Sequence, residues 1–186
     1  MRDDGGTLGA RAVFLDKDGT LIPNVPYNAD PARITLSAGA GEALRRLQDG
    51  GYRLFVVSNQ SGVARGFFPA SALDGVEARL RALLAAEGAA LDGVAWCPHH
   101  PRGAIPAYAV ECDCRKPLPG MLVRLAAAHG VDLGASWMVG DSAADVGAGR
   151  AAGCRTVLVG GAASADAAPD AAVADLAAAA DAILAA

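Results

Sequence analysis

The sequence predicts an α/β fold in which a parallel, doubly wound sheet carries helices on both faces. Three observations lead to this prediction. Apolar segments of strand length alternate with segments of helical periodicity along most of the chain. The apolar segments lack polar alternation, which is typical of parallel strands that are buried on both faces. Polar residues directly follow several of these segments, at the edge of the sheet where such folds bind ligands.

Five segments are predicted to form buried strands, because each is a short run of mainly apolar residues. Between and after them, apolar residues recur at helical spacing, and glycines mark helix ends. The predicted strands are residues 11–16, 52–59, 93–97, 136–141 and 155–160. The predicted helices run from Ala40 to a stop at Gly50-Gly51, from Leu73 to Gly88, from Pro119 to Gly130, from Ser142 to Gly153, and over 171–184.

Composition favours a single domain over residues 1–186 and excludes several classes of protein. The chain is 53% hydrophobic and 19% charged, so it can bury a core and is not disordered by composition. The net charge of −4 without a basic block argues against nucleic acid as a partner. No apolar run reaches the roughly 18 residues of a membrane span, and residues 1–10 lack the apolar core of a signal peptide and are expected to be flexible. A cytoplasmic monomer with reduced thiols is the resulting expectation.

Two aspartates follow the first predicted strand, in the stretch FLDKDGTLI. Asp16 and Asp18 are two residues apart, so both carboxylates face the same way in an extended segment. Because carboxylates this close repel each other, a cation is expected between them, most simply Mg²⁺. Asp141 and Asp145 bring further acids to the end of another predicted strand. A metal site shared by acids from distant parts of the chain is therefore predicted.

The proline-rich segment 97–118 breaks the alternation and holds all but one of the four cysteines. Three thiolates and one imidazole match a closed tetrahedral zinc site, although their one-residue gaps are tighter than in zinc fingers. A reduced loop without metal is the alternative, and His100 is a competing imidazole. Cys154 begins a predicted strand and is expected to be a buried apolar thiol. The candidate zinc ligands are Cys97, His99, Cys112 and Cys114.

Four motifs together resemble the haloacid dehalogenase (HAD) superfamily. They are DKDGT, VVSNQSGVARG, CRKPLPGM and VGDSAADV, in the order of that family, and they cover roughly residues 11–160. The resemblance implies that Asp16 attacks phosphorus and forms an aspartyl-phosphate, and that Asp18 protonates the leaving oxygen and then activates water. It also implies that Mg²⁺ binds Asp16, the backbone carbonyl of Asp18, and Asp141.

The resemblance further implies which residues bind substrate. Hydroxyl and amide donors, Ser58 and Asn59 foremost, are expected to hold the phosphate, and Lys116 to face the aspartate and phosphate charges. Arg115 is expected to bind a second phosphate or a sugar hydroxyl, or only to neutralise the site. Tyr27 is either a substrate contact or an anchor of its loop. The full expected set is Asn24, Val25, Pro26, Tyr27, Ser58, Asn59, Gln60, Ser61, Arg115 and Lys116.

The cysteine and histidine set resembles the zinc loop of a narrow branch of this superfamily. That pattern places the imidazole ligand at His99 and implies a structural zinc that aims Arg115 and Lys116 at the substrate. Members of this branch lack a large cap domain and act on small phosphorylated molecules. The activity this implies is magnesium-dependent hydrolysis of the 7-phosphate of D-glycero-D-manno-heptose 1,7-bisphosphate. Histidinol-phosphate hydrolysis is the alternative, and a catalytically inactive zinc-stabilised binding module is an alternative of a different class.

Overall fold

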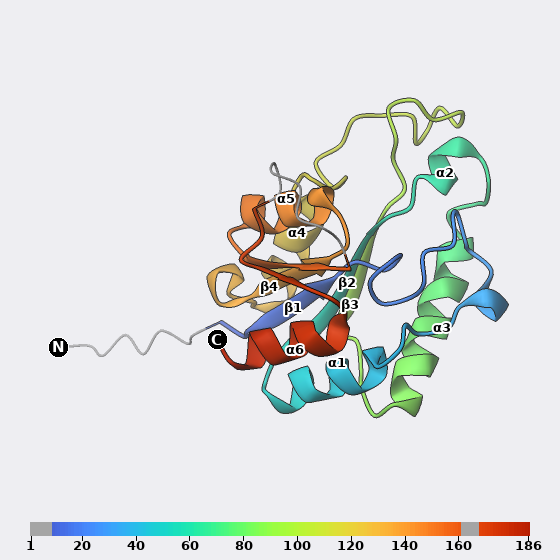
Figure 1. Cartoon of the computed structure of the whole chain (residues 1–186). Helices are drawn as coiled ribbons and strands as arrows, with labels where there is room; N and C mark the ends of the chain where they lie inside the picture. Colours follow the sequence, from blue (N-terminus) through green and yellow to red (C-terminus); the bar gives the residue numbers. More distant parts are fainter. Residues whose placement is uncertain (1–8, 161–167) are drawn as a thin grey trace.

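A six-stranded sheet lies at the centre of the protein (Figure 1). This computed structural model describes residues 9–160 and 168–186. Every pair of neighbouring strands is parallel. In sheet order the strands are β3 (Gly93–Cys97), β2 (Arg53–Asn59), β1 (Ala12–Leu15), β4 (Trp137–Gly140), β5 (Arg155–Val159) and β6 (Ala171–Val173). The chain thus runs outward from β1 to β3 and then continues on the other side of β1, which creates a switch point between β1 and β4.

Alternate residues of β1 enter two separate hydrophobic cores. Val13 and Leu15 pack into a core shared with α1, α3 and α6, whereas Ala12 and Phe14 pack into a core shared with α4 and α5. Figure 1 shows the two groups of helices on opposite faces of the sheet. The doubly wound α/β prediction is therefore confirmed. The helices are α1 (Ala40–Asp49), α2 (Gly62–Arg65), α3 (Ala72–Ala86), α4 (Gly120–His129), α5 (Ala143–Ala152) and α6 (Leu176–Leu184), with 3₁₀ turns η1 (Pro31–Arg33) and η2 (Leu133–Ala135).

The helices end near the glycines that were predicted to stop them. Gly130 after α4 and Gly153 after α5 have φ values of 64° and 87°, a left-handed conformation that costs glycine little. No large cap domain is inserted within the described residues, and the long connection between β3 and α4 is the segment that carries the cysteines. No helix in the described ranges is both long and apolar enough to span a membrane.

The prediction of one C-terminal helix over 171–184 is wrong at its start. Residues 171–173 form β6, which extends the sheet beside β5, and α6 begins only at Leu176. Alanine favours helix, but pairing with an exposed sheet edge overrides that preference over three residues. Asp175 then caps α6, its side chain accepting a hydrogen bond from the Ala178 amide at 2.9 Å.

The expected flexibility of the N-terminal segment concerns mainly residues 1–8, which lie outside the described residues. Ala10, at the end of that segment, forms an isolated parallel bridge with Val131. Residues 161–167, where the alanine-rich tail begins, are likewise outside the described residues.

Candidate active site

The polar residues that follow the strands meet at one edge of the sheet. Asp16 comes directly after β1, Asn59 ends β2, and Asp141 comes directly after β4. Because these three strands are adjacent and parallel, their carboxyl ends meet in one place. Lys116 reaches the same place from the loop before α4, and its Nζ lies 2.6 Å from Asp16 Oδ1. The structure therefore brings together acids and a cation that are far apart in the sequence.

Lys116 holds the centre of this arrangement. Its ammonium also contacts Asp145 Oδ1 at 2.6 Å and donates to the Val57 carbonyl at 2.8 Å. The lysine is only 4% exposed, so its charge is compensated by protein groups rather than by water. Burial alone would lower its pKa, but the neighbouring Asp16 and Asp145 raise it. Lys116 is therefore charged at neutral pH.

The pKa of Asp16 is raised from 3.8 to about 6, chiefly by burial, while Lys116 opposes the shift. The pKa of Asp141 is also raised, first by burial and then by the charge of Asp145. Asp16, Asp141 and Asp145 each offer a carboxylate oxygen, and these atoms lie within 4.8 Å of one another. One ammonium for three close carboxylates leaves excess negative charge, and a hard divalent cation with oxygen ligands fits such a site.

Two glycines allow the acids to approach this closely. A Cβ on Gly19, which has a φ of 83°, would lie 2.0 Å from Asp141 Oδ2. A Cβ on Gly140 would lie 2.3 Å from the Asp145 side chain. The glycine in the sequence DKDGT is thus required both by its left-handed backbone and by the carboxylate that packs on it.

The role of Asp145 was left open by the sequence. Its Oδ2 accepts hydrogen bonds from the Ser142 amide at 3.1 Å and the Ser142 hydroxyl at 2.5 Å, and its Oδ1 pairs with Lys116. Both oxygens therefore have protein partners. Asp145 holds Lys116 beside the Asp16 carboxylate from the start of α5.

Asp18 is held by its other neighbours. Its Oδ2 accepts a hydrogen bond from Gln60 Nε2 at 3.1 Å and lies 3.3 Å from Lys17 Nζ. Its Oδ1 is buried and has no hydrogen-bond partner among the described residues. Lys17 is fully buried, and its Nζ also lies 3.4 Å from the Asn28 carbonyl, to which it donates. Of the two Asp18 oxygens, Oδ1 is therefore the one without a protein partner in the described structure.

A cleft of about 230 Å³ opens beside Asp18. It is lined by the loop after β1 and by the segment after β2, which contain most of the residues expected to bind substrate. Its lining residues are Asp18, Asn24, Val25, Pro26, Tyr27, Asn59, Gln60, Ser61 and Gly62. Arg115 and Lys116 instead line a neighbouring groove of about 280 Å³.

Two of the expected phosphate donors are engaged with protein groups in this structure. The Asn59 amide donates to the Lys116 carbonyl at 3.1 Å and accepts from the Lys116 amide at 3.0 Å. The Ser58 hydroxyl is buried and accepts a hydrogen bond from Gln60 Nε2 at 3.0 Å. Asn59 therefore positions the lysine, and a direct contact of either residue with phosphate stays a prediction.

Tyr27 projects from the cleft wall with a φ of 54°, an unusual conformation for a residue that is not glycine. Its ring is half exposed and packs edge-on against Phe67, with ring centroids 4.6 Å apart. Phe67 was not predicted from the sequence, because nothing in the local pattern distinguishes it from a core aromatic residue.

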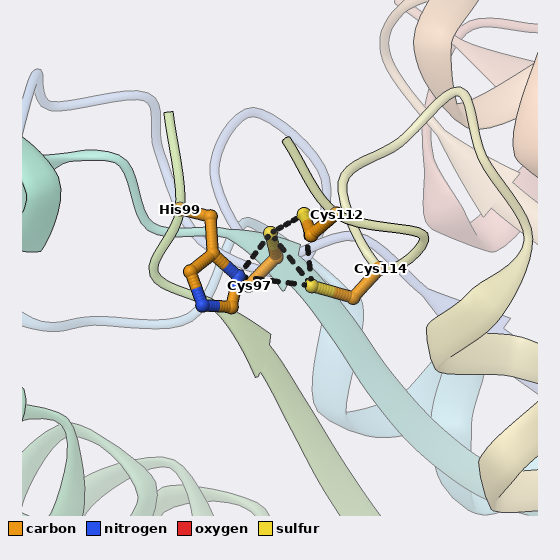
Figure 2. Close-up of side chains that lie close together, drawn as sticks. All are labelled: Cys97, His99, Cys112 and Cys114. Atoms are coloured by element: carbon orange, nitrogen blue, oxygen red, sulfur yellow. Dashed lines mark hydrogen bonds between the residues drawn. The ribbon is translucent and has the colours of Figure 1, made fainter. Parts of the chain in front are cut away.

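The four candidate zinc ligands converge at the end of β3 (Figure 2). The sulfur atoms of Cys97, Cys112 and Cys114 lie 3.1 to 3.6 Å apart, and His99 Nδ1 lies 3.3 Å from Cys114 Sγ and 3.9 Å from Cys97 Sγ. Ligands at roughly 2.0–2.3 Å around a tetrahedral zinc would be separated by roughly 3.5–3.8 Å, so the cluster is close to the required size. Burial, followed by neighbouring thiols, raises the pKa of Cys97. A divalent metal would supply the positive charge that thiolates need here.

Cationic residues surround the second histidine of this loop. His100 lies outside the cluster of four, and its Nε2 is 3.4 Å from Arg65 Nη2. The pKa of His100 is lowered, first by desolvation and then by the charges of Arg115, Arg65 and Arg102. Arg65 was not predicted from the sequence as a site residue, because its neighbour His100 lies in a loop 35 residues further along the chain.

Comparison with known proteins gives consistent matches. A family model described as HAD-hydrolase-like matches residues 113–183. A D-glycero-beta-D-manno-heptose-1,7-bisphosphate 7-phosphatase of Rhodopseudomonas palustris is 42% identical over 76% of this chain and 79% of its own length. The enzyme of that name from Yersinia pestis is 38% identical over 82% of this chain and 81% of its own length. The crystal structure of a D,D-heptose 1,7-bisphosphate phosphatase from B. bronchiseptica, complexed with magnesium and phosphate, has a TM-score of 0.79 and 32% identity, covering 94% of this chain and 98% of the other.

Proposed function

Because the chain belongs to the HAD superfamily of phosphatases, in the branch of the heptose 1,7-bisphosphate 7-phosphatases, and is a phosphoric monoester hydrolase, we propose that it removes the 7-phosphate of D-glycero-D-manno-heptose 1,7-bisphosphate. The observation that carries the proposal is the contact of Lys116 with the buried Asp16, next to an Asp18 that keeps one oxygen free. A binding module would not need these three groups together. The protein is further proposed to act as a single-domain cytoplasmic monomer.

The proposed reaction has two steps. An oxygen of Asp16 attacks phosphorus, the bond from phosphorus to the sugar oxygen breaks, and Oδ1 of Asp18 donates its proton to that oxygen. Asp18 then removes a proton from water, the water oxygen attacks phosphorus, and the aspartyl-phosphate bond breaks to release inorganic phosphate. Lys116 stabilises the negative charge that the phosphate brings to Asp16.

Asp16, the backbone carbonyl of Asp18, and Asp141 would hold Mg²⁺, which supplies positive charge to the phosphate oxygens when bound. Asp145 is proposed to support this site through Lys116 rather than to bind the metal. The excess of carboxylates over cations at this sheet edge supports the assignment.

Mg²⁺ is expected to raise the melting temperature more at pH 7 than at pH 5. In the metal-free protein the folded-state pKa of Asp16 is about 6 against 3.8 in an unfolded chain. Folded protein therefore binds more protons over that interval, and this group's contribution to stability falls as pH rises from 3.8 to about 6. Mg²⁺ binds the ionised form of Asp16. Below about pH 6 the metal must displace a proton, so its apparent affinity falls by about tenfold for each unit that the pH decreases. Thermal melts with and without MgCl₂ at constant ionic strength measure this, and a pH-independent shift would contradict it.

The cysteine and histidine cluster is proposed to hold one structural zinc. Cys112→Ser is expected to reduce zinc from about one per chain, to increase amide exchange over residues 98–118, and to weaken inhibition by inorganic phosphate, because Lys116 is carried on the released loop. Cys154→Ser is the matched control, since this buried thiol lies outside the cluster. Mass spectrometry for zinc and hydrogen exchange give the readouts. Wild-type zinc content in Cys112→Ser would argue against the site.

The substrate is tested by comparing kcat/KM for phosphate release from the heptose bisphosphate and from histidinol phosphate. The proposal expects the heptose bisphosphate to be favoured, because the cations beside Lys116 can compensate a second phosphate. Higher efficiency with histidinol phosphate would overturn the substrate assignment and leave the hydrolase chemistry in place.

A further inference from the structure

Arg65 occupies a fixed position next to the proposed phosphate-binding segment. It is the last residue of α2, and its amide donates to the Ser61 carbonyl at 3.0 Å. Ser61 and Gly62, at the start of this single turn, line the cleft beside Asp18. The backbone of Arg65 is therefore held next to the cleft by this helical turn.

The zinc loop holds α2 from the other side. The amides of Ala104 and Ile105 donate to the Ala64 carbonyl at 2.7 and 2.9 Å. Gly103 approaches so closely that a Cβ there would lie 2.7 Å from the same carbonyl. Figure 1 shows the tip of the loop between β3 and α4 next to α2. Arg65 thus lies where the substrate cleft and the zinc loop join.

The partly buried guanidinium of Arg65 has no carboxylate partner in the described structure. Nη2 contacts only the His100 ring, at 3.4 Å, and Nε is buried without a hydrogen-bond partner in the described part of the chain. Leaving a charged donor buried and unpaired costs free energy, which a bound anion would remove.

Arg115 brings a second guanidinium to this place. Its Nη1 donates to the His99 carbonyl at 3.2 Å. The positive charges of both arginines contribute to the lowered pKa of the adjacent His100. Glu111 lines the groove beside Arg115, yet neither arginine is within ion-pair distance of a carboxylate in the described structure. Two guanidinium groups without a carboxylate match the charge and the hydrogen-bonding geometry of a phosphate.

We propose that Arg65 is a specificity-determining residue that, together with Arg115, binds the phosphate of the substrate that is not hydrolysed. The inference rests on the proposed function and deepens it. Lys116, directly after Arg115, faces the reacting phosphate at Asp16, so the two cationic positions are adjacent but separate. Recognition therefore depends on a substrate that carries two phosphate groups.

Arg65→Gln tests the proposal with two substrates, the heptose 1,7-bisphosphate and the heptose 7-phosphate, which lacks the second phosphate. The kcat/KM for the bisphosphate is expected to fall by about 10- to 100-fold, and that for the 7-phosphate by less than about threefold. Inhibition by the product, heptose 1-phosphate, reports binding without turnover. Its inhibition constant is expected to rise by about the same factor as the kcat/KM for the bisphosphate falls. Arg65→Lys keeps the charge but not the planar fork and is expected to show an intermediate loss on the bisphosphate alone.

Arg102→Gln is the control. Like Arg65→Gln, this substitution removes one positive charge near His100, but the Arg102 side chain is exposed to solvent. Its efficiency with both substrates is expected to change by less than about threefold. Equal losses on both substrates in the Arg65 variants, or unchanged product inhibition, would overturn the inference. Failure of the wild-type protein to hydrolyse the bisphosphate would instead refute the proposed function, and it is seen before any variant is made.

Discussion

Asp16→Asn is expected to abolish phosphate release while the fold and zinc content persist. Asparagine has nearly the same shape as aspartate but cannot form an acyl phosphate, so the rate should fall by at least about four orders of magnitude. Burial raises the pKa of Asp16 to about 6, which means that its ionised form is costly to bury. Lys116 keeps Asp145 as a partner in the variant, at 2.6 Å in the present structure. The melting temperature should therefore change little.

Rates of phosphate release, thermal melts and zinc analysis measure this result together. Asp18→Asn is the matched comparison, because it keeps the nucleophile and removes the proton donor. With p-nitrophenyl phosphate, whose leaving group needs no proton, Asp18→Asn should still form the aspartyl-phosphate and then hydrolyse it slowly. Near-normal turnover by Asp16→Asn would show that the covalent mechanism is wrong.

Local patterns were sufficient to predict most of the fold and to nominate residues for the candidate site. Fully apolar strands predicted a buried parallel sheet, and in such a sheet the residues after β1, β2 and β4 must meet at one edge. The position of Lys116 beside Asp16 followed only from the resemblance to the HAD motifs, because 100 residues separate the two. Residue type and spacing pointed to three cysteines and a histidine, the resemblance chose His99 over His100, and the structure brings these four residues together.

The contacts that Asn59 and Asp145 make with Lys116 were not predictable from the sequence. The Asn59 amide binds the backbone of Lys116, 57 residues later, and Asp145 pairs with the same lysine. Either side chain alone is compatible with a turn, a helix cap or a metal ligand. Strand β6 was missed for a similar reason, since three residues of low strand preference are held by the edge of β5. Only the assembled sheet distinguishes these possibilities.

The two lysines carried a signal that the sequence alone did not resolve. Both Lys17 and Lys116 lie within motifs, in a chain that otherwise uses arginine for its cations. In the structure they are 0% and 4% exposed, and each contacts a proposed catalytic aspartate. A compact ammonium fits between buried carboxylates where a planar guanidinium would need more room.

Lys116→Met is expected to have the largest effect on stability. Methionine retains the length and apolar character of the lysine stem, so the main change is the loss of charge. Asp16 and Asp145 would then be buried side by side without a cation, which should lower the free energy of unfolding by about 3–5 kcal/mol. Chemical denaturation of the metal-free protein measures the loss, and phosphatase activity is expected to fall with it.

The pH dependence separates this electrostatic cause from a loss of packing. Lys116 opposes the upward shift of the Asp16 pKa, so without the ammonium the folded-state pKa of Asp16 should rise further, and stability is then lost as pH increases through it. The deficit of Lys116→Met should therefore be larger at about pH 7 than at about pH 5. Adding Asp145→Asn removes one of the two buried negative charges and should recover part of the loss, because the two residues share one interaction. A deficit that is equal at both pH values and unaffected by Asp145→Asn would mean that the lysine stem, and not its charge, stabilises the site.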